Sequence, residues 1–394
     1  MVISKANYRT RVERIQEQMM KNNIAAAVLE KPQNSYYVTG YQPMLYSRPI
    51  YVVLVQHDEP TLIVPYLREP QAKDESWVTD IKPYFEFPVM NRTFPRDSLT
   101  ALKEELSRKA VLNKTIGIEM EHISANALEI LRKILPDAKL VDVSALIEQI
   151  RSIKDQEEVE LIRTACGLAD LAMNRASEVI AERGTEKDVV IEGIQTMQDE
   201  WKMKHSNLNI YDLTNISTTL WGSCESGPQN QLHQVPHKPT DRRISDGDLV
   251  TVVMIPALNG YRGELERTFA VGQPGEKAGK MFNAVLEARQ KAFDLIKPGA
   301  MFHEVDEAAR DVFKKYGMLD YMRHGVGHSM GLELHEGWIF RKETASTIQR
   351  NMVFTIEPGL YHEGIGSVRH SDTVRVTSTG FEFLTKYDRG FLTR

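Results

Sequence analysis

The chain has 394 residues, of which 42% are hydrophobic and 26% are charged, and its formal net charge is -5. This length is more than one hydrophobic core usually supports, so two domains are expected. The mildly acidic balance gives no electrostatic basis for nucleic-acid binding, and no apolar run approaches the roughly 20 residues that a membrane-spanning helix needs.

Cysteine content and the N-terminal segment together indicate a cytoplasmic protein. Cys166 and Cys224 are the two cysteines; they are too few for a disulfide framework and lack the spacing of a metal motif. The N-terminal segment is charged and has no apolar signal-peptide core. A reducing compartment is the simplest interpretation.

Residues 1–150 predict a three-layer α/β domain. Tyr8, Val12, Ile15 and Met19 recur at helical spacing and predict a helix over residues 5–22. Strands alternating with helices over the rest of this region are typical of the α/β class. Apolar, largely β-branched runs predict strands at 24–29, 50–55, 61–64 and 115–119, and helical periodicity predicts helices at 97–109 and 124–135.

A second domain is predicted for residues 151–394. Asp155 with Glu158, and Thr185 with Asp188, have the spacing of helix-capping pairs, so each pair predicts the start of a helix. Residues 204–246 are polar without clear periodicity, and loops of this length in compact domains are usually functional. A strand pair is then predicted at 248–271 and helices at 275–296 and 303–316.

Three glycine-dense segments of this second domain carry acids and histidines. The first is GYRGELERTF, where Glu264, Glu266 and Thr268 alternate and would share one face of a strand. The others are HGVGHSMGLELHEG, residues 324–337, and FTIEPGLYHEGIGSVRHSD, residues 354–372. Their shared composition predicts one site assembled from all three segments.

These segments, with PHKPTDRRISDGD at residues 236–248, resemble in order and spacing the pita-bread hydrolases. That family holds creatinase, Xaa-Pro dipeptidase, aminopeptidase P and methionine aminopeptidase. NSYYVTGY at residues 34–41 is similar to the N-terminal domain that creatinase shares with the Xaa-Pro enzymes. The resemblance implies a creatinase/prolidase-type α/β N-terminal domain over 1–150 and an α+β pita-bread catalytic domain over 151–394. The latter is a curved antiparallel sheet flanked by helices, usually in a homodimer.

The resemblance also exposes departures at the metal site. The family's metallopeptidases hold two ions with two Asp, one His and two Glu. Here the first Asp position falls on Val253 or Met254 and the last Glu position on Ser371. Because a two-metal clamp needs carboxylates enough for both ions, that site is predicted to be lost. The alternative is one divalent ion, such as Mn or Co, on the three ligand residues that remain, which are Glu264, His328 and Glu357.

Two further features look like creatinase, which needs no metal, so we predict a site without a cofactor. Glu266 stands where the metallopeptidases have Thr. Arg48, in the loop YQPMLYSRP, matches a creatinase arginine that reaches the neighbouring subunit's site and holds the substrate carboxylate. Binding residues also concentrate on loops held by a scaffold.

A hydrolase without a metal needs a general base, and histidine titrates nearest neutral pH. The resemblance puts an active-site histidine at His237, in the PH pair before the PTDR run, so His237 is the candidate base, with His233 as the reserve. His370 is a third possibility, one residue away from the creatinase position, and such an offset reverses the side chain in a strand. Glu266 and Glu357 would bind a guanidinium or amidinium group, and His328 would hydrogen-bond substrate or water. The predicted substrate-binding residues are Arg48, Glu264, His335, Arg341 and His233.

These residues predict a metal-independent, creatinase-like hydrolase that cleaves a C–N bond in a small zwitterionic substrate of the amidine or guanidine type. It would be a homodimer with a shared active site. One alternative is an Xaa-Pro dipeptidase- or aminopeptidase-like metallopeptidase with a degenerate metal site. The other is a non-catalytic pita-bread protein that binds a ligand.

Overall fold

The computed structural model describes residues 3–43, 48–85, 94–213, 217–230 and 238–394. Apart from Met1, the chain forms two compact units: residues 2–151 with 211–217, and residues 152–210 with 218–394. In the described ranges no helix is both long and apolar enough to cross a bilayer.

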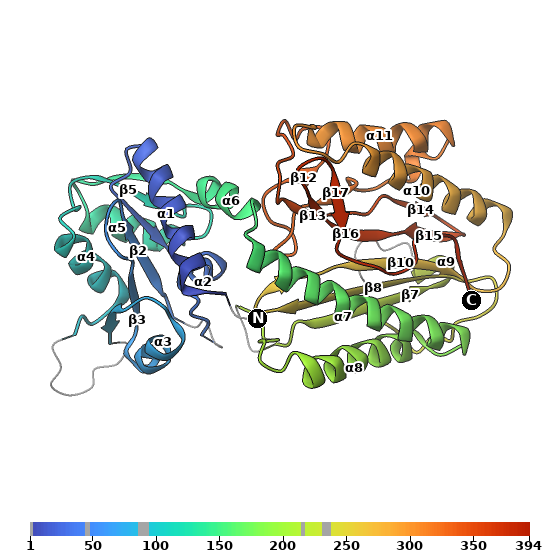
Figure 1. The fold of residues 1–394 in the computed structure, drawn as a ribbon, viewed down its shortest axis with the longest axis horizontal. Coiled ribbons are helices and arrows are strands. Elements are labelled where there is room, and N and C mark those ends of the chain that lie inside the picture. Colours follow the sequence, from blue (N-terminus) through green and yellow to red (C-terminus); the bar gives the residue numbers. More distant parts are fainter. Residues whose placement is uncertain (1–2, 44–47, 86–93, 214–216, 231–237) are drawn as a thin grey trace. The chain divides into compact units, whose positions relative to one another are not determined.

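The N-terminal unit is a six-stranded mixed sheet in the order β4-β3-β2-β1-β5-β6 (Figure 1). Strand β2 is antiparallel to both of its neighbours, whereas the other pairs are parallel. The strands are β1 (Ala26–Leu29), β2 (Tyr51–Val55), β3 (Thr61–Pro65), β4 (Asp80–Tyr84), β5 (Thr115–Ile118) and β6 (Lys139–Asp142). The helices are α1 (Lys5–Lys21), α2 (Pro32–Thr39), α3 (Glu69–Glu75), α4 (Ser98–Arg108), α5 (Ala125–Ile134) and α6 (Ser144–Ser152). The predicted α/β class is confirmed.

Helix α1 forms where the apolar spacing predicts it. Ser4 caps its N-terminus by accepting a hydrogen bond from the backbone N–H of Asn7 at 3.3 Å, and the predicted apolar stripe is buried. Helix α2 was not predicted because NSYYVTGY has no helical periodicity. It begins at Pro32 and ends at Thr39, and the Gly40 that follows has a φ of 73°, the left-handed conformation that often ends a helix.

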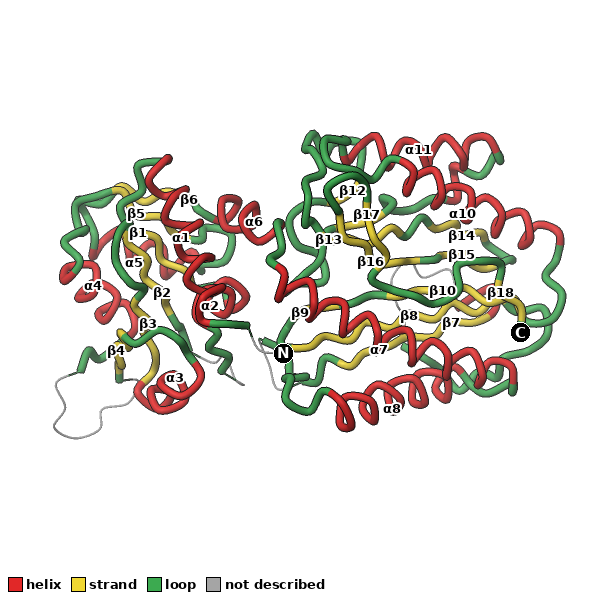
Figure 2. Tube along the Cα trace, in the orientation of Figure 1, coloured by secondary structure: helices red, strands yellow, loops and turns green. Residues whose placement is uncertain are grey.

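The C-terminal unit is built on an eight-stranded sheet whose main path is β13-β16-β10-β8-β7. In Figures 1 and 2, helices α7 and α8 lie along one side of the sheet and α10 and α11 along the other. The predicted pita-bread class is confirmed. The helices are α7 (Gln156–Ala181), α8 (Glu186–Lys204), α9 (Gly227–Asn230), α10 (Glu276–Asp294) and α11 (Phe302–Lys315). The main strands are β7 (Leu220–Ser226), β8 (Leu249–Leu258), β10 (Leu265–Ala270), β13 (Val353–Ile356) and β16 (Ser371–Val376).

Short strands complete this unit. Strand β9 (Tyr261–Arg262) pairs with β8, β17 (Phe381–Phe383) with β16, and β18 (Leu392–Thr393) with β10. Two separate hairpin sheets are β11 (Gly327–His328) with β12 (Ile339–Phe340), and β14 (Gly359–His362) with β15 (Gly366–Arg369). Both capping pairs predicted from the sequence are present, at the first turns of α7 and α8.

Strand β7 lies inside the region that the sequence predicts as one long loop. Its residues, LWGSCES, neither alternate cleanly nor form a continuous apolar run. Antiparallel pairing along β8, from Leu220 opposite Pro256 to Ser226 opposite Val250, makes this segment a strand. Tertiary pairing therefore overrides a weak local pattern.

Candidate active site

Glu264, His328 and Glu357 meet in the C-terminal unit. The Nε2 atom of His328 lies 3.7 Å from Oε2 of Glu264 and 3.6 Å from Oε1 of Glu357. One potential ligand atom from each residue lies within 4.8 Å of those of the other two. Two carboxylates and one imidazole form a donor set that suits divalent ions such as Mn²⁺, Co²⁺ or Zn²⁺.

Glycine lets the second and third of these segments approach each other closely. Glu264 directly precedes β10, His328 ends β11, and Glu357 directly follows β13. A Cβ atom on Gly327 would lie 2.0 Å from the carbonyl oxygen of Thr355, which is too close for any residue other than glycine. The backbone N–H of Glu357 then donates to Val326 at 2.7 Å, so the two strands are locked side by side.

Hydrogen bonds orient two members of the cluster. Nδ1 of His328 is 3.3 Å from the carbonyl oxygen of Ser329, so Nδ1 carries the proton and the Nε2 lone pair faces the carboxylates. Ser371 donates its hydroxyl to Oε1 of Glu264 at 2.8 Å. Each contact leaves one electron-donating atom directed into the cluster.

Burial sets the protonation of the cluster. It raises the pKa of Glu264 to about 6. Burial, and then the nearby carboxylates of Glu264 and Glu266, raise the pKa of Glu357 well above its usual range. Burial lowers the pKa of His328 to about 4, which keeps the imidazole neutral. A divalent cation would stabilise the deprotonated form of these buried carboxyls, and a neutral imidazole can donate its lone pair to such an ion.

Glu266, two residues further along β10, has a different partner. Its Oε2 atom lies 2.6 Å from Nε of Arg369 at the end of β15, and both side chains are buried. The guanidinium of Arg369 also donates to the hydroxyl of Tyr361 at 3.1 Å, and that hydroxyl lies 2.8 Å from Nε2 of His324. The charge of Glu266 is therefore already balanced, which removes the physical support for its predicted role in binding a cationic substrate.

Strand register shows what replaces the missing ligands. Val253 is paired with Glu266, and Glu266 with Ser371, so all three point to the same face of the sheet. Met254 points the other way, since a Cβ atom on Gly193 of helix α8 would meet its methyl group at 2.5 Å. Of the two candidates for the first Asp position, Val253 is the one on the face of the cluster.

His335 and Arg341, both predicted to bind substrate, lie differently. The ring of His335 packs against that of His328, with ring centres 4.0 Å apart and planes tilted by 43°, and the residue is otherwise exposed, so it borders the cluster. Arg341 is exposed, with its Nε atom 3.9 Å from Glu343. Across the described ranges no contact joins Arg341 to the cluster, so its predicted role has no structural support.

His370 is the third possible base, and the structure places it elsewhere. Its ring is fully buried and packs edge-on against Phe282 of helix α10, with ring centres 5.8 Å apart. Its Nε2 atom lies 3.3 Å from the carbonyl oxygen of Thr268. The next residue, Ser371, points to the cluster instead. The one-residue offset thus turns His370 into the helical layer, where it cannot serve as the base.

The other two candidate bases, His233 and His237, lie outside the described residues. The chain on both sides of them is fixed by Glu186 at the start of α8. One carboxylate oxygen accepts hydrogen bonds from the N–H and hydroxyl of Ser226, both at 2.7 Å. The other accepts from the N–H and hydroxyl of Thr240 at 2.9 and 2.7 Å. Arg48 is described and exposed, and it belongs to the N-terminal unit.

Arg369, Tyr361 and His324 were not assigned roles from the sequence, although all three lie within the glycine-dense segments. The available signal was Arg369 itself, because an arginine at the end of the short apolar strand GSVR needs a buried partner. The sequence does not show which carboxylate that partner is.

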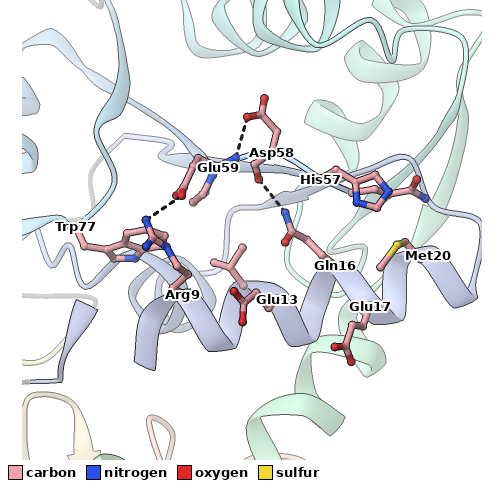
Figure 3. A pocket seen from close by; sticks show the side chains of 12 residues that line it. Arg9, Glu13, Gln16, Glu17, Met20, His57, Asp58, Glu59 and Trp77 are labelled. Carbon is pink, nitrogen blue, oxygen red and sulfur yellow. Dashed lines mark hydrogen bonds and ion pairs between the residues drawn. The ribbon is translucent and has the colours of Figure 1, made fainter. Parts of the chain in front are cut away.

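The N-terminal unit contains a separate hollow of about 500 Å³ between α1 and the turn at residues 56–60 (Figure 3). Arg9 in its wall donates to Glu59 at 3.0 Å and lies over the ring of Trp77 at 5.5 Å. Gln16 donates to the carbonyl of Asp58 at 2.8 Å. None of the predicted site residues that the structure describes lines this hollow, and its arginine is already paired, so the carboxylate–histidine cluster remains the candidate active site.

Comparison with known proteins identifies both parts of the chain. The sequence model of metallopeptidase family M24 matches residues 160–378. The creatinase/prolidase N-terminal domain model matches residues 11–153.

Individual relatives span nearly the whole chain. The Xaa-Pro dipeptidase of Pyrococcus furiosus is 33% identical over 383 residues, which are 97% of this chain and 99% of that protein. The solved prolidase structure from Pyrococcus horikoshii OT3 is 31% identical, with a TM-score of 0.78, and covers 96% of this chain and 99% of its own. The dipeptidase PepE of Mycobacterium ulcerans is 22% identical with a TM-score of 0.85 over 100% of this chain and 99% of its own, which supports the fold.

These comparisons show that one prediction, a site without a cofactor, is wrong. The matching family is one of metallopeptidases, and two archaeal relatives above 30% identity are Xaa-Pro dipeptidases. The inference failed because it treated the missing carboxylates at Val253 and Ser371 as the loss of the whole site. The remaining donors, Glu264, His328 and Glu357, still form one compact group for a divalent ion.

Proposed function

Because the chain belongs to metallopeptidase family M24, we propose that it hydrolyses the amide C–N bond of a small Xaa-Pro-type dipeptide with the help of a bound divalent metal ion. The observation that carries this proposal is the buried cluster of Glu264, His328 and Glu357, with a neutral imidazole and two carboxylates. The names of the relatives support the substrate class, and the donor set supports the metal.

A divalent ion in such a site acts as a Lewis acid that polarises a carbonyl oxygen or lowers the pKa of a bound water. The chain's own residues prepare the place. The carbonyl of Ser329 fixes the tautomer of His328, and the hydroxyl of Ser371 fixes one oxygen of Glu264. The packing of His335 against His328 and its exposure otherwise support the proposal that His335 hydrogen-bonds a substrate oxygen.

Hydrolysis also needs a group that takes a proton from water and returns one to the leaving nitrogen. His237 stays our prediction for this role. The creatinase-like alternative, with an amidine or guanidine substrate, loses its main support because Glu266 is paired with Arg369 at 2.6 Å.

A substrate screen with and without metal tests the function. Protein treated with a chelator, then reloaded with Mn²⁺ or Co²⁺, is assayed on Xaa-Pro dipeptides, creatine and cyclic amidines. We expect hydrolysis of Xaa-Pro dipeptides that is lost on chelation and restored by metal. Turnover of creatine or amidines alone would favour the creatinase-like reading, and no turnover by the reloaded protein would favour a binding protein.

A homodimer with a shared site stays a prediction, and so does a cytoplasmic location. If Arg48 acts in the partner's site, an Arg48→Ala subunit and a Glu264→Gln subunit should complement each other. In a 1:1 mixture half the dimers are mixed and each regains one of two sites, so about a quarter of the wild-type rate should return. The rate is measured after unfolding and refolding the mixture. No recovery, with mixed dimers demonstrated by native mass spectrometry, would exclude sharing through Arg48.

A further inference from the structure

The candidate active site contains more buried charge than its three potential ligands carry. Glu266 is 3% exposed, and its partner Arg369 is 8% exposed. The two lie on neighbouring elements, with Nε of Arg369 2.6 Å from Oε2 of Glu266. Buried charges are tolerated when they are balanced, so the pair must be counted together with Glu264 and Glu357.

Arg369 is held in place from several directions. Its guanidinium donates to the Tyr361 hydroxyl at 3.1 Å. The same hydroxyl also contacts His324, and the backbone fixes the direction of that second hydrogen bond. Nδ1 of His324 donates to the carbonyl of Gly325 at 2.8 Å, so its proton lies on Nδ1. Nε2 of His324 must then accept from the Tyr361 hydroxyl at 2.8 Å. The Tyr361 oxygen is thus left as an acceptor for Arg369.

The same face lacks two of the carboxylates that a second metal ion would need. Val253 and Ser371 are the register partners of Glu266 on its two neighbouring strands. Val253 offers no atom that could bind a metal ion, and the Ser371 hydroxyl donates a hydrogen bond to Glu264 at 2.8 Å. The donor set therefore fits one ion and does not fit two.

The charge count agrees. Counted as formal charges, the carboxylates of Glu264, Glu266 and Glu357 carry three negative charges and the guanidinium of Arg369 carries one positive charge, so these side chains sum to two negative. One divalent ion brings the buried site to neutrality, whereas a second would leave an excess of two positive charges.

We propose that the Glu266–Arg369 ion pair takes the place of a second metal ion, so that the site takes one divalent ion per subunit with Arg369 as its second, fixed cation. This inference rests on the proposed function, because it assumes that Glu264, His328 and Glu357 hold an ion. In it, Glu266 and Arg369 are positioning residues that set the charge of the site without touching the ion.

The test is a double-mutant cycle on Glu266 and Arg369, in which the content of bound Mn²⁺ and the affinity for Mn²⁺ are measured. Metal content is measured by elemental analysis and Mn²⁺ affinity by competition with a chelator, on wild type, Glu266→Gln, Arg369→Met and the double variant. We expect one Mn²⁺ per subunit in the wild type. Glu266→Gln should bind Mn²⁺ at least about tenfold more weakly, because it leaves the guanidinium unbalanced and arginine cannot shed its proton.

Adding Arg369→Met to Glu266→Gln should bring the affinity back to within about threefold of wild type, because the net charge of two negative returns. Arg369→Met alone should bind no more weakly than wild type. A merely structural role would weaken Mn²⁺ binding in all three variants. The exposed pair 3.9 Å apart, Arg341 and Glu343, supplies the matched control, and Arg341→Met with Glu343→Gln should leave Mn²⁺ affinity unchanged.

The outcomes separate the two proposals. Two Mn²⁺ per subunit in the wild type, or a double variant no better than Glu266→Gln, would overturn the inference and leave the proposed function standing. No bound Mn²⁺ at all would overturn the metal site on which both rest. The wild-type stoichiometry decides the first point even if one variant fails to fold, and folding is checked by circular dichroism.

Discussion

Glu357→Gln is expected to lower hydrolysis by about a thousandfold or more and to leave the protein without its metal ion. In the proposed metal site Glu357 would supply one of three donors, and an amide oxygen carries no negative charge to hold the ion. Losing the group that polarises the scissile carbonyl or activates water removes several kcal/mol of transition-state stabilisation. The measurements are steady-state rates on an Xaa-Pro dipeptide and metal content by elemental analysis.

The same variant should be more stable than wild type once both are stripped of metal. Burial and the neighbouring acids raise the pKa of Glu357 well above its usual range. In the metal-free protein, burial therefore favours the protonated form of this carboxyl, and taking up that proton near neutral pH costs stability. Glutamine has the same shape without that cost, so thermal unfolding of the chelated variant should occur a few degrees higher.

Glu363→Gln is the matched control, since Glu363 lies exposed in the turn between β14 and β15. It should change neither metal content nor rate. If Glu357→Gln retained a full complement of metal and hydrolysed at the wild-type rate, the assignment of Glu357 as a ligand would be wrong.

The grouping of Glu264, His328 and Glu357 could be predicted because each stands in a glycine-dense motif whose order along the chain is recognisable. The ion pair between Glu266 and Arg369 could not be predicted from the sequence. Arg369 lies far along the chain, and the fold brings the two together because Thr268 of β10 exchanges hydrogen bonds with the backbone N–H and carbonyl of Arg369 at the end of β15. Without that contact, Glu266 looked available for a cationic substrate, and the site looked more like that of creatinase.

The sequence also does not predict which side chains near the end of the chain face the cluster. His370 and Ser371 are adjacent, and the choice of which faces the cluster depends on the register between β16 and β10. A period of two gives the alternation but not its phase. Helices α7 and α8 were predictable because capping pairs and apolar spacing are local signals, whereas β7 exists only through pairing with β8.

Asp372, the last residue of the SVRHSD segment, is expected to be a structural residue whose loss is among the most damaging in the chain. It is fully buried, 2.9 Å from the guanidinium of Arg267, in an ion pair with Arg289, and 3.5 Å from Arg389. Thr385 donates its hydroxyl to it at 2.7 Å. Removing this one carboxylate leaves buried guanidinium groups without a counter-charge.

We therefore expect Asp372→Asn to lower the free energy of unfolding by about 3–5 kcal/mol, as breaking a buried ion pair from one side usually does. Denaturant unfolding at pH 7 measures it. Asp294→Asn is the control, because Asp294 is an exposed residue of α10, 4.0 Å from Lys291, and should cost less than about 0.5 kcal/mol.

The dependence on pH supplies a second check of the same prediction. Burial by itself would raise the pKa of Asp372, but the guanidiniums of Arg267, Arg289 and Arg389 outweigh it and hold the pKa below its usual range. A lowered pKa in the folded state gives stability that is complete above the unfolded pKa, about 3.9, and is lost as the pH falls through the folded value. The deficit of Asp372→Asn should thus be constant from neutral pH down to about pH 4 and shrink in more acid solution. A deficit that instead grew on acidification would mean that Asp372 is not the counter-charge of these arginines.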